Sequence, residues 1–122
     1  MDLTPLVKPG LQMVERYGPA GFRVGGTIYK TPILVFPERT IEWPEGALSE
    51  VGLAAVVEDG AVELLLLGLG RRIAPVPAAL RQVLKGHGIA VEPMDTGAAC
   101  RTFNVVVAED RRVAAALLPL SS

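Results

Sequence analysis

The chain has 122 residues, with 12 basic and 13 acidic side chains and a formal net charge of −1. Half of the residues are hydrophobic, which excludes an intrinsically disordered chain and is sufficient for one hydrophobic core. The near-zero charge argues against a general nucleic-acid binder, because such proteins carry a strongly basic surface. One cysteine and one histidine exclude an intramolecular disulfide and any metal site built on several cysteines, so we expect neither a metal nor a cofactor.

No basic region followed by a long apolar stretch begins the chain, and the longest apolar run, Leu64–Leu69, is too short to cross a bilayer. We therefore expect a cytoplasmic protein without stable membrane insertion. Two prolines and a glycine in residues 1–10 indicate an extended segment. Residues 11–118 are expected to form a single α/β domain, and residues 119–122 a frayed tail.

The first half of the domain consists of short apolar stretches separated by glycine and proline. This punctuation predicts a meander of short β-strands, over Gln12–Tyr17, Phe22–Val24, Thr27–Tyr29, Ile33–Phe36 and Thr40–Trp43. Gly25-Gly26 suits a two-residue hairpin turn, and Pro37 and Pro44 each end a strand. Trp43 is expected to lie in the core.

Helical signals alternate with strand signals after Trp43. Ser49 as an N-cap and Gly60 as a stop predict a helix over residues 50–58, and Val62–Leu67 is expected to be a buried strand. Pro77 is expected in the first turn of the next helix, which Gly88 ends. Its predicted apolar face comprises Leu80, Val83, Leu84 and His87.

A further strand is predicted at Ile89–Pro93, which completes a strand-helix-strand unit and implies parallel neighbours. Residues 98–108 are ambiguous, because their apolar spacing favours a helix whereas Val105-Val106-Val107 is β-branched. We predict a helix, since the final strand at Arg112–Leu118 requires a crossover before it.

Ligand crevices of parallel sheets form beyond the carboxyl ends of the strands, where two loops of this chain are expected to meet. Glycines in the first loop let backbone amides approach a bound group, and Arg71 could neutralise an anion, although no complete dinucleotide or phosphate-loop motif is present. The candidate ligand or partner surface comprises Gly68, Gly70, Arg71, Asp95, Thr96, Gly97, Cys100, Arg101, Thr102 and Asn104.

Most of these residues also have a structural interpretation. Cys100 lies in the first turn of the predicted helix beside Arg101, which lowers a thiol pKa, but a lone cysteine among small residues usually packs as a small hydrophobe. Asp95 is either an acid–base group or a helix cap. Arg101, Thr102 and Asn104 form either a polar network or a recognition surface. Exposure would indicate a recognition surface, whereas burial and mutual hydrogen bonding would indicate scaffold.

The stretch Met94–Val105 (MDTGAACRTFNV) and the following Arg111–Leu117 (RRVAAAL) resemble a family of small domains of unknown function that includes the mitochondrial respiratory complex I assembly factor three. The resemblance extends from about Gln12 to Leu118, and further matches lie at Tyr17-Gly18, Gly21-Phe22-Arg23, Leu67–Gly70 and Pro77. It implies a three-layer α/β fold around a mixed, partly parallel sheet, and a helix over residues 98–108. It implies no catalytic residues, because the family has no established active site.

Three functional hypotheses follow. The first is a non-enzymatic protein-binding or assembly-factor-like module, whose partner the resemblance suggests is a respiratory-complex subunit. The second is a small domain that binds an anion or nucleotide at the loop edge, and the third is a thiol enzyme that uses Cys100. A homo-oligomer is compatible with the sequence, whereas nucleic acid is not an expected partner.

Overall fold

The computed structural model describes residues 9–120. Its helices are α1 (Ala54–Asp59), α2 (Ala78–Gly86), α3 (Thr96–Ala108) and a short 3-10 helix, η1 (Pro44–Gly46). Its strands are β1 (Val14–Gly18), β2 (Gly21–Val24), β3 (Thr27–Tyr29), β4 (Ile33–Val35), β5 (Thr40–Glu42), β6 (Leu64–Gly68), β7 (Ala90–Met94) and β8 (Val113–Leu117). The helix predicted over residues 98–108 is therefore confirmed as α3.

A mixed five-stranded sheet lies at the centre of the fold, in the order β5-β4-β8-β6-β7. β6 pairs in parallel with β7 and β8, whereas β4 pairs antiparallel with β5 and β8. The predicted strand-helix-strand unit and its parallel pairing are confirmed. β7 lies at the edge, where Pro93 is tolerated because a proline cannot donate a ladder hydrogen bond.

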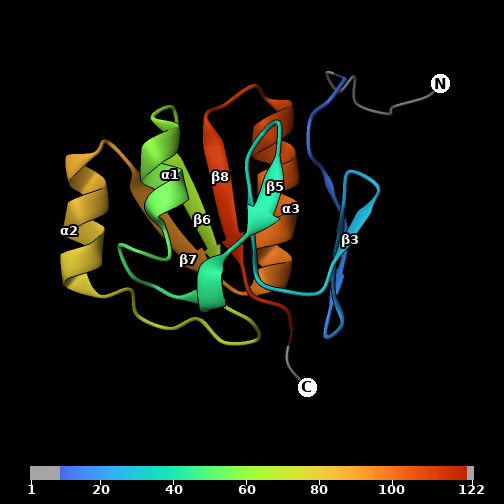
Figure 1. Ribbon diagram of the computed structural model, residues 1–122, viewed down its shortest axis with the longest axis horizontal. Helices are drawn as coiled ribbons and strands as arrows, with labels where there is room; N and C mark the ends of the chain where they lie inside the picture. The colour runs from blue at the N-terminus through green and yellow to red at the C-terminus, as the bar shows by residue number, and fades with distance from the viewer. Residues whose placement is uncertain (1–8, 121–122) are drawn as a thin grey trace.

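The sheet is covered on both faces, which gives the three layers (Figure 1). Side chains alternate along β6, so Leu65 and Leu67 pack in the core beneath α1 and α2, while Leu66 packs in the core beneath α3. Trp43 is buried on the α1 side, as predicted, and its Nε1 donates to Ala47 O at 3.0 Å. The fold is thus α/β. One face of the main sheet is covered by α1 and α2, and the other by α3 with the small sheet beside it (Figure 1).

All five strands of the N-terminal half are present, but they belong to two sheets. β1, β2 and β3 form a separate antiparallel sheet beside α3, with Gly25 and Gly26 at positive φ in the predicted hairpin turn (Figure 1). β4 and β5 instead join the main sheet. The division has a physical cause, because β4 is buried along its whole length and requires cover on both faces.

The start of α1 differs from the prediction. The helix begins at Ala54 and not at residue 50, and Ser49 does not cap it. Ser49 Oγ instead accepts a hydrogen bond from Gly52 N at 3.0 Å in the preceding turn. A Cβ on Gly52 would lie 2.3 Å from Ala47 O, so only glycine fits at this position of the turn. The predicted stop at Gly60 is confirmed, since this residue adopts the left-handed conformation that ends α1.

The start of α2 is displaced by one residue, whereas its predicted stop at Gly88 is confirmed, since Gly88 follows the C-cap at φ +76°. Pro77 precedes the helix with extended backbone, and His87 follows its last turn. Leu80 and Leu84 are buried as predicted, but the expected place of His87 on the buried face is wrong, because the helix ends at Gly86 and His87 is exposed.

The tail is more ordered than the sequence suggests. Leu118 N donates to Gly68 O at 2.8 Å, and Leu120 N donates to Gly18 O at 3.1 Å. These bonds hold residues 118–120 against both sheets, so the prediction of a frayed tail is wrong for Pro119 and Leu120. Residues 121–122, and residues 1–8 of the predicted extended segment, lie outside the described residues.

Candidate functional site

The carboxyl ends of β6, β7 and β8 lie at one edge of the sheet, because the three strands are parallel neighbours. The loop after β6 and the loop after β7 lie side by side there. Leu69 N donates to Met94 O at 3.0 Å, and Thr96 N donates to Gly70 O at 2.9 Å. The sequence-based expectation that the two loops lie together is therefore correct.

Thr96 closes the centre of the edge. Its side chain is completely buried, and its Oγ1 accepts a hydrogen bond from Gly70 N at 2.8 Å while donating to Leu118 O at 2.6 Å. One hydroxyl thus joins the segments that follow β6 and β8 to the start of α3. This geometry makes Thr96 a structural residue, and it occupies the Gly70 amide that a ligand would otherwise use.

The glycines of the first loop serve packing and turn geometry. A Cβ on Gly68 would lie 2.8 Å from Leu117 Cδ2 and 3.0 Å from Thr96 Cα, so this glycine allows α3 to approach β6 closely. Gly70 adopts φ +81°, which favours glycine, and no atom lies near its Cβ position.

Asp95 is the N-cap of α3. Its Oδ1 accepts a hydrogen bond from Ala98 N at 2.8 Å, and Ala99 N donates to Asp95 O at 3.0 Å. Gly97 follows in the first turn, where a Cβ would lie 2.8 Å from Tyr17 Oη and 3.2 Å from Arg101 Nη1. The carboxylate of Asp95 therefore has a complete structural role, and Gly97 makes room for the side chains above it.

A shallow hollow of about 300 Å³ remains at the rim of this edge. Arg101 is exposed, and its Nη1 donates to Tyr17 Oη at 2.9 Å, which joins α3 to β1. Arg71 contributes a second exposed guanidinium from the loop after β6. The complete lining is Tyr17, Gly70, Arg71, Asp95, Gly97, Arg101 and Leu120.

Cys100 is buried in the core beneath α3 and is 2% exposed. Burial raises the pKa of its thiol to about 12, and the nearby Arg101 lowers it only in part. The expected lowering of the pKa by Arg101 and the helix start is thus outweighed by desolvation. A thiol that is protonated at neutral pH and closed to solvent lacks what a nucleophile requires.

Asn104 joins α3 to the small sheet. Its Nδ2 donates to Val14 O at 2.9 Å, and its Oδ1 accepts from Val14 N at 2.8 Å, although the two residues are 90 positions apart. Thr102 is half-buried on the same helix. Of the three polar residues that the sequence left open, Asn104 belongs to the internal polar network and Arg101 to the surface.

Sequence reasoning missed Tyr17 and Leu120 as members of this rim. Both come from segments far from the two loops, and Tyr17 lies 84 positions from its partner Arg101. The exposed fraction of Tyr17, 39%, is large for an aromatic side chain beside a core. No local signal marks either residue, because their proximity to α3 arises only from the packing of the small sheet and the tail.

Two kinds of feature are absent from residues 9–120. No three His, Cys, Asp or Glu side chains gather in a way that could hold a metal ion. Among the same residues, no helix combines the length and apolar character required to cross a bilayer.

Relatives of the chain are found among bacterial and animal proteins. An uncharacterized protein of Rhodobacter capsulatus is 39% identical over 111 residues, which cover 91% of this chain and 87% of that protein. NADH dehydrogenase (ubiquinone) 1 alpha subcomplex assembly factor 3 of Danio rerio is 35% identical over 88% of this chain and 64% of its own length. The human protein of that name is 30% identical over 87% of this chain and 60% of its own length. The chain thus spans less than two thirds of the length of these assembly factors.

Solved structures share the fold. The crystal structure of an outer membrane protein from Bartonella henselae has a TM-score of 0.83 at 34% identity and covers 93% of this chain and 98% of that chain. The solution structure of a Bordetella pertussis protein, described as an Mth938-like domain, has a TM-score of 0.79 at 31% identity and covers 100% of this chain and 94% of that chain. Residues 14–118 match the family described as "Protein of unknown function (DUF498/DUF598)". The chain therefore belongs to the DUF498/DUF598 family and has the fold of its Mth938-like relatives.

Proposed function

We propose that this chain is a non-enzymatic protein-binding module that acts as an assembly factor. The observation that supports this most strongly is its similarity, over nearly nine tenths of its length, to proteins named as assembly factors of NADH dehydrogenase. By extension, we infer that its partner is a subunit of a respiratory complex or of another multisubunit membrane complex. We further propose a cytoplasmic location, following the expectation drawn from the sequence.

The geometry of the rim supports binding in preference to catalysis. Thr96 and Asn104 are engaged in internal hydrogen bonds, and Cys100 is buried. The accessible groups at the rim include the guanidinium groups of Arg101 and Arg71 and the ring of Tyr17. Arginine and tyrosine are enriched at the energetic centres of protein interfaces.

Native electrophoresis of cells that express the tagged chain, with mass spectrometry of each gel slice, tests the proposal. We expect the chain to migrate with incomplete assemblies of NADH dehydrogenase, and cell fractionation to recover the unbound pool in the cytoplasm. Arg101→Glu should reduce this co-migration, whereas Arg111→Glu, an exposed arginine in the loop after α3, should not. Migration of the wild-type chain only as a free protein would count against the proposed function.

Binding of a small anion in the rim hollow is the second candidate. The volume of about 300 Å³ and the two guanidinium groups of Arg71 and Arg101 favour it. A ligand of the native state raises the melting temperature, so a screen of phosphate, nucleotides and carboxylates should identify a stabilising anion. Arg101→Ala should abolish that stabilisation and Arg111→Ala should retain it. A screen in which no anion stabilises the wild-type protein removes this candidate.

A further inference from the structure

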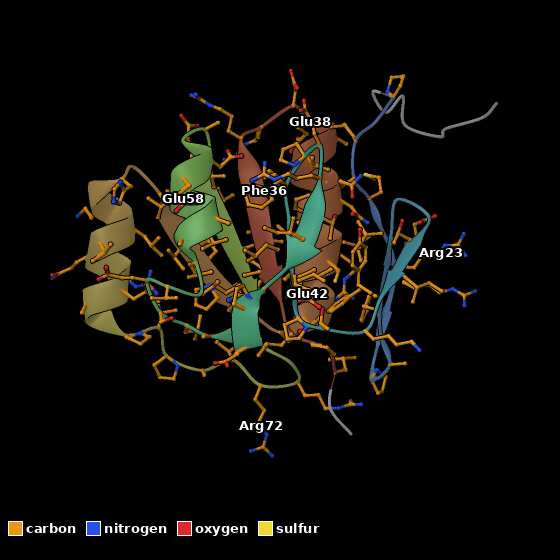
Figure 2. The ribbon with its side chains drawn as sticks, in the orientation of Figure 1. Arg23, Phe36, Glu38, Glu42, Glu58 and Arg72 are labelled. Carbon is orange, nitrogen blue, oxygen red and sulfur yellow. The ribbon has the colours of Figure 1, made fainter. Side chains whose placement is uncertain are left out.

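The outer face of the small sheet carries a row of exposed side chains. Arg16 of β1 lies opposite Arg23 of β2, which lies opposite Ile28 of β3. Directly opposed residues in an antiparallel sheet point to the same side. We call Arg16, Arg23 and Ile28 the arginine face. All three are exposed, Ile28 to 68%, and Figure 2 shows Arg23 extending away from the body of the molecule.

These three side chains contribute little to the stability of the small sheet. Like charges placed directly opposite each other destabilise a sheet, and Arg16 faces Arg23 in this way. The carboxylate of Glu15 lies 3.5 Å from Arg23 Nε, but both side chains are nearly half exposed, so the pair contributes little. An exposed isoleucine beside two arginines instead suits a partner that supplies negative charge and one apolar side chain.

The arginine face borders a hollow of about 270 Å³. Phe22, which is almost fully buried, lines it, and the turn at Gly18–Gly21 forms one side. The hollow is smaller than most metabolite sites but accommodates an amino-acid side chain. The complete lining is Arg16, Tyr17, Gly18, Pro19, Ala20, Gly21, Phe22, Arg23 and Ile28, and this set contains no carboxylate.

Tyr17 lines this hollow and also the hollow at the rim of the main sheet. It lies opposite Phe22 in the strand register, so its side chain is on the face of the small sheet opposite the arginine face. Arg71 and Arg101 line the rim hollow, whereas Arg16 and Arg23 line the hollow beside the arginine face. The carboxylate that lines the rim hollow, Asp95, already accepts the capping hydrogen bond of α3. The positive charge beside this hollow therefore comes from Arg16 and Arg23, of which Arg23 has Glu15 as an ion-pair partner at 3.5 Å.

We infer that the arginine face and the hollow beside it dock an acidic segment of a partner protein, with one apolar side chain of that segment in the hollow beside Ile28. The inference rests on the proposed protein-binding function and specifies the chemistry of the partner. The hollow favours a protein segment over an anionic membrane, because a flat lipid surface would not fill it.

The probe is a fluorescein-labelled peptide of Asp and Glu residues with one central Leu, studied by fluorescence anisotropy with the intact chain. Matched peptides replace the Leu with Ser, or every acidic residue with Lys. We expect the acidic Leu peptide to bind most tightly. Its affinity should fall as NaCl rises from about 50 to about 500 mM. Arg23→Glu and Ile28→Ser should each weaken binding about tenfold, and the matched control Arg111→Glu less than about twofold.

Arg16→Glu separates docking from folding. It replaces an opposed like-charge pair with an Arg–Glu pair, so it should raise the melting temperature by about 1 °C while weakening the peptide about tenfold. Loss of binding together with loss of stability would attribute the effect to unfolding and overturn the inference.

Two further outcomes overturn the inference. One is equal binding of the acidic and Lys peptides, or binding that Arg23→Glu and Ile28→Ser leave unchanged. The other is stronger binding to phosphatidylglycerol vesicles than to the acidic peptide, with loss in the same variants, which would identify a membrane surface. If the Arg23→Glu chain still migrates with NADH dehydrogenase assemblies, only the docking inference falls, whereas a wild-type chain that never does so removes the proposed function itself.

Discussion

Replacing Thr96 with valine should destabilise the protein by removing one hydroxyl without changing the shape of the side chain. Thr96 is completely buried, and its Oγ1 serves Gly70 N at 2.8 Å and Leu118 O at 2.6 Å. Each buried polar group that loses its partner costs about 1–3 kcal/mol. For the two groups together we expect a loss of about 3 kcal/mol in the free energy of unfolding, or about 10 °C in Tm.

Urea denaturation of Thr96→Val and Thr96→Ser, followed by circular dichroism, measures this effect. Serine keeps the hydroxyl and loses one methyl group, so its cost should be about 1 kcal/mol. Hydrogen exchange of the Gly70 amide should accelerate in the valine variant and stay slow in the serine variant. If valine lies within about 0.5 kcal/mol of wild type, or if serine is as destabilising as valine, the hydroxyl does not hold this edge together.

Three other predictions follow from the packing. Asn104→Ala should lower the free energy of unfolding by about 2 kcal/mol, because Val14 N and O both lose their partner; an unchanged Tm would contradict this. Gly68→Ala should cost about 2 kcal/mol by forcing α3 from β6, whereas the control Gly86→Ala, which has open space at its Cβ position in α2, should gain about 0.5 kcal/mol; equal effects would refute the close-packing argument. Burial raises the pKa of the Cys100 thiol from 9.0 to about 12, so the unfolded state loses its proton first, and we expect stability to fall by about 1.4 kcal/mol per pH unit between these values. The difference between wild-type and Cys100→Ala stability curves isolates that slope, and its absence would show that the thiol is accessible to water.

Periodicity and connection rules together predicted the main elements of the fold. The uninterrupted apolar run at Leu64–Leu69 identified β6, because only a strand covered on both faces tolerates such a run. Residues 98–108 could not be assigned from propensity, since Val105-Val106-Val107 favours a strand. The need for a crossover before β8 predicted α3 correctly, so topology was more informative there than local preference.

Local sequence failed where long-range packing decides the structure. Ser49 has the chemistry of a helix cap, but its Oγ accepts from Gly52 N in the turn before α1, where a Cβ on Gly52 would clash with Ala47 O. Leu120 lies beside β1 only because the fold brings the tail to Gly18. The tail's order is therefore a tertiary property that a proline-containing terminus does not reveal.

The candidate site shows the same division between local and tertiary effects. Asp95 was recognisable as a cap because capping depends on residues three positions apart. The thiol of Cys100 could not be judged in this way, since the proximity of Arg101 is local whereas burial beneath α3 depends on the whole core. Desolvation is the larger of these two effects on its pKa, and it reverses the expectation drawn from neighbours in the sequence.

The distribution of polar contacts at the loop edge bears on where recognition takes place. Parallel sheets usually bind ligands between the loops at the carboxyl ends of their strands, but Thr96 fills that position here and bonds to both flanking segments. The accessible polar side chains therefore lie at the rim, where the small sheet brings Tyr17 against Arg101 of α3. Gly97 is the residue that permits this arrangement, because any side chain there would displace the bridge between Tyr17 and Arg101. The small sheet thus contributes Tyr17 to the accessible rim that we propose as part of a binding surface.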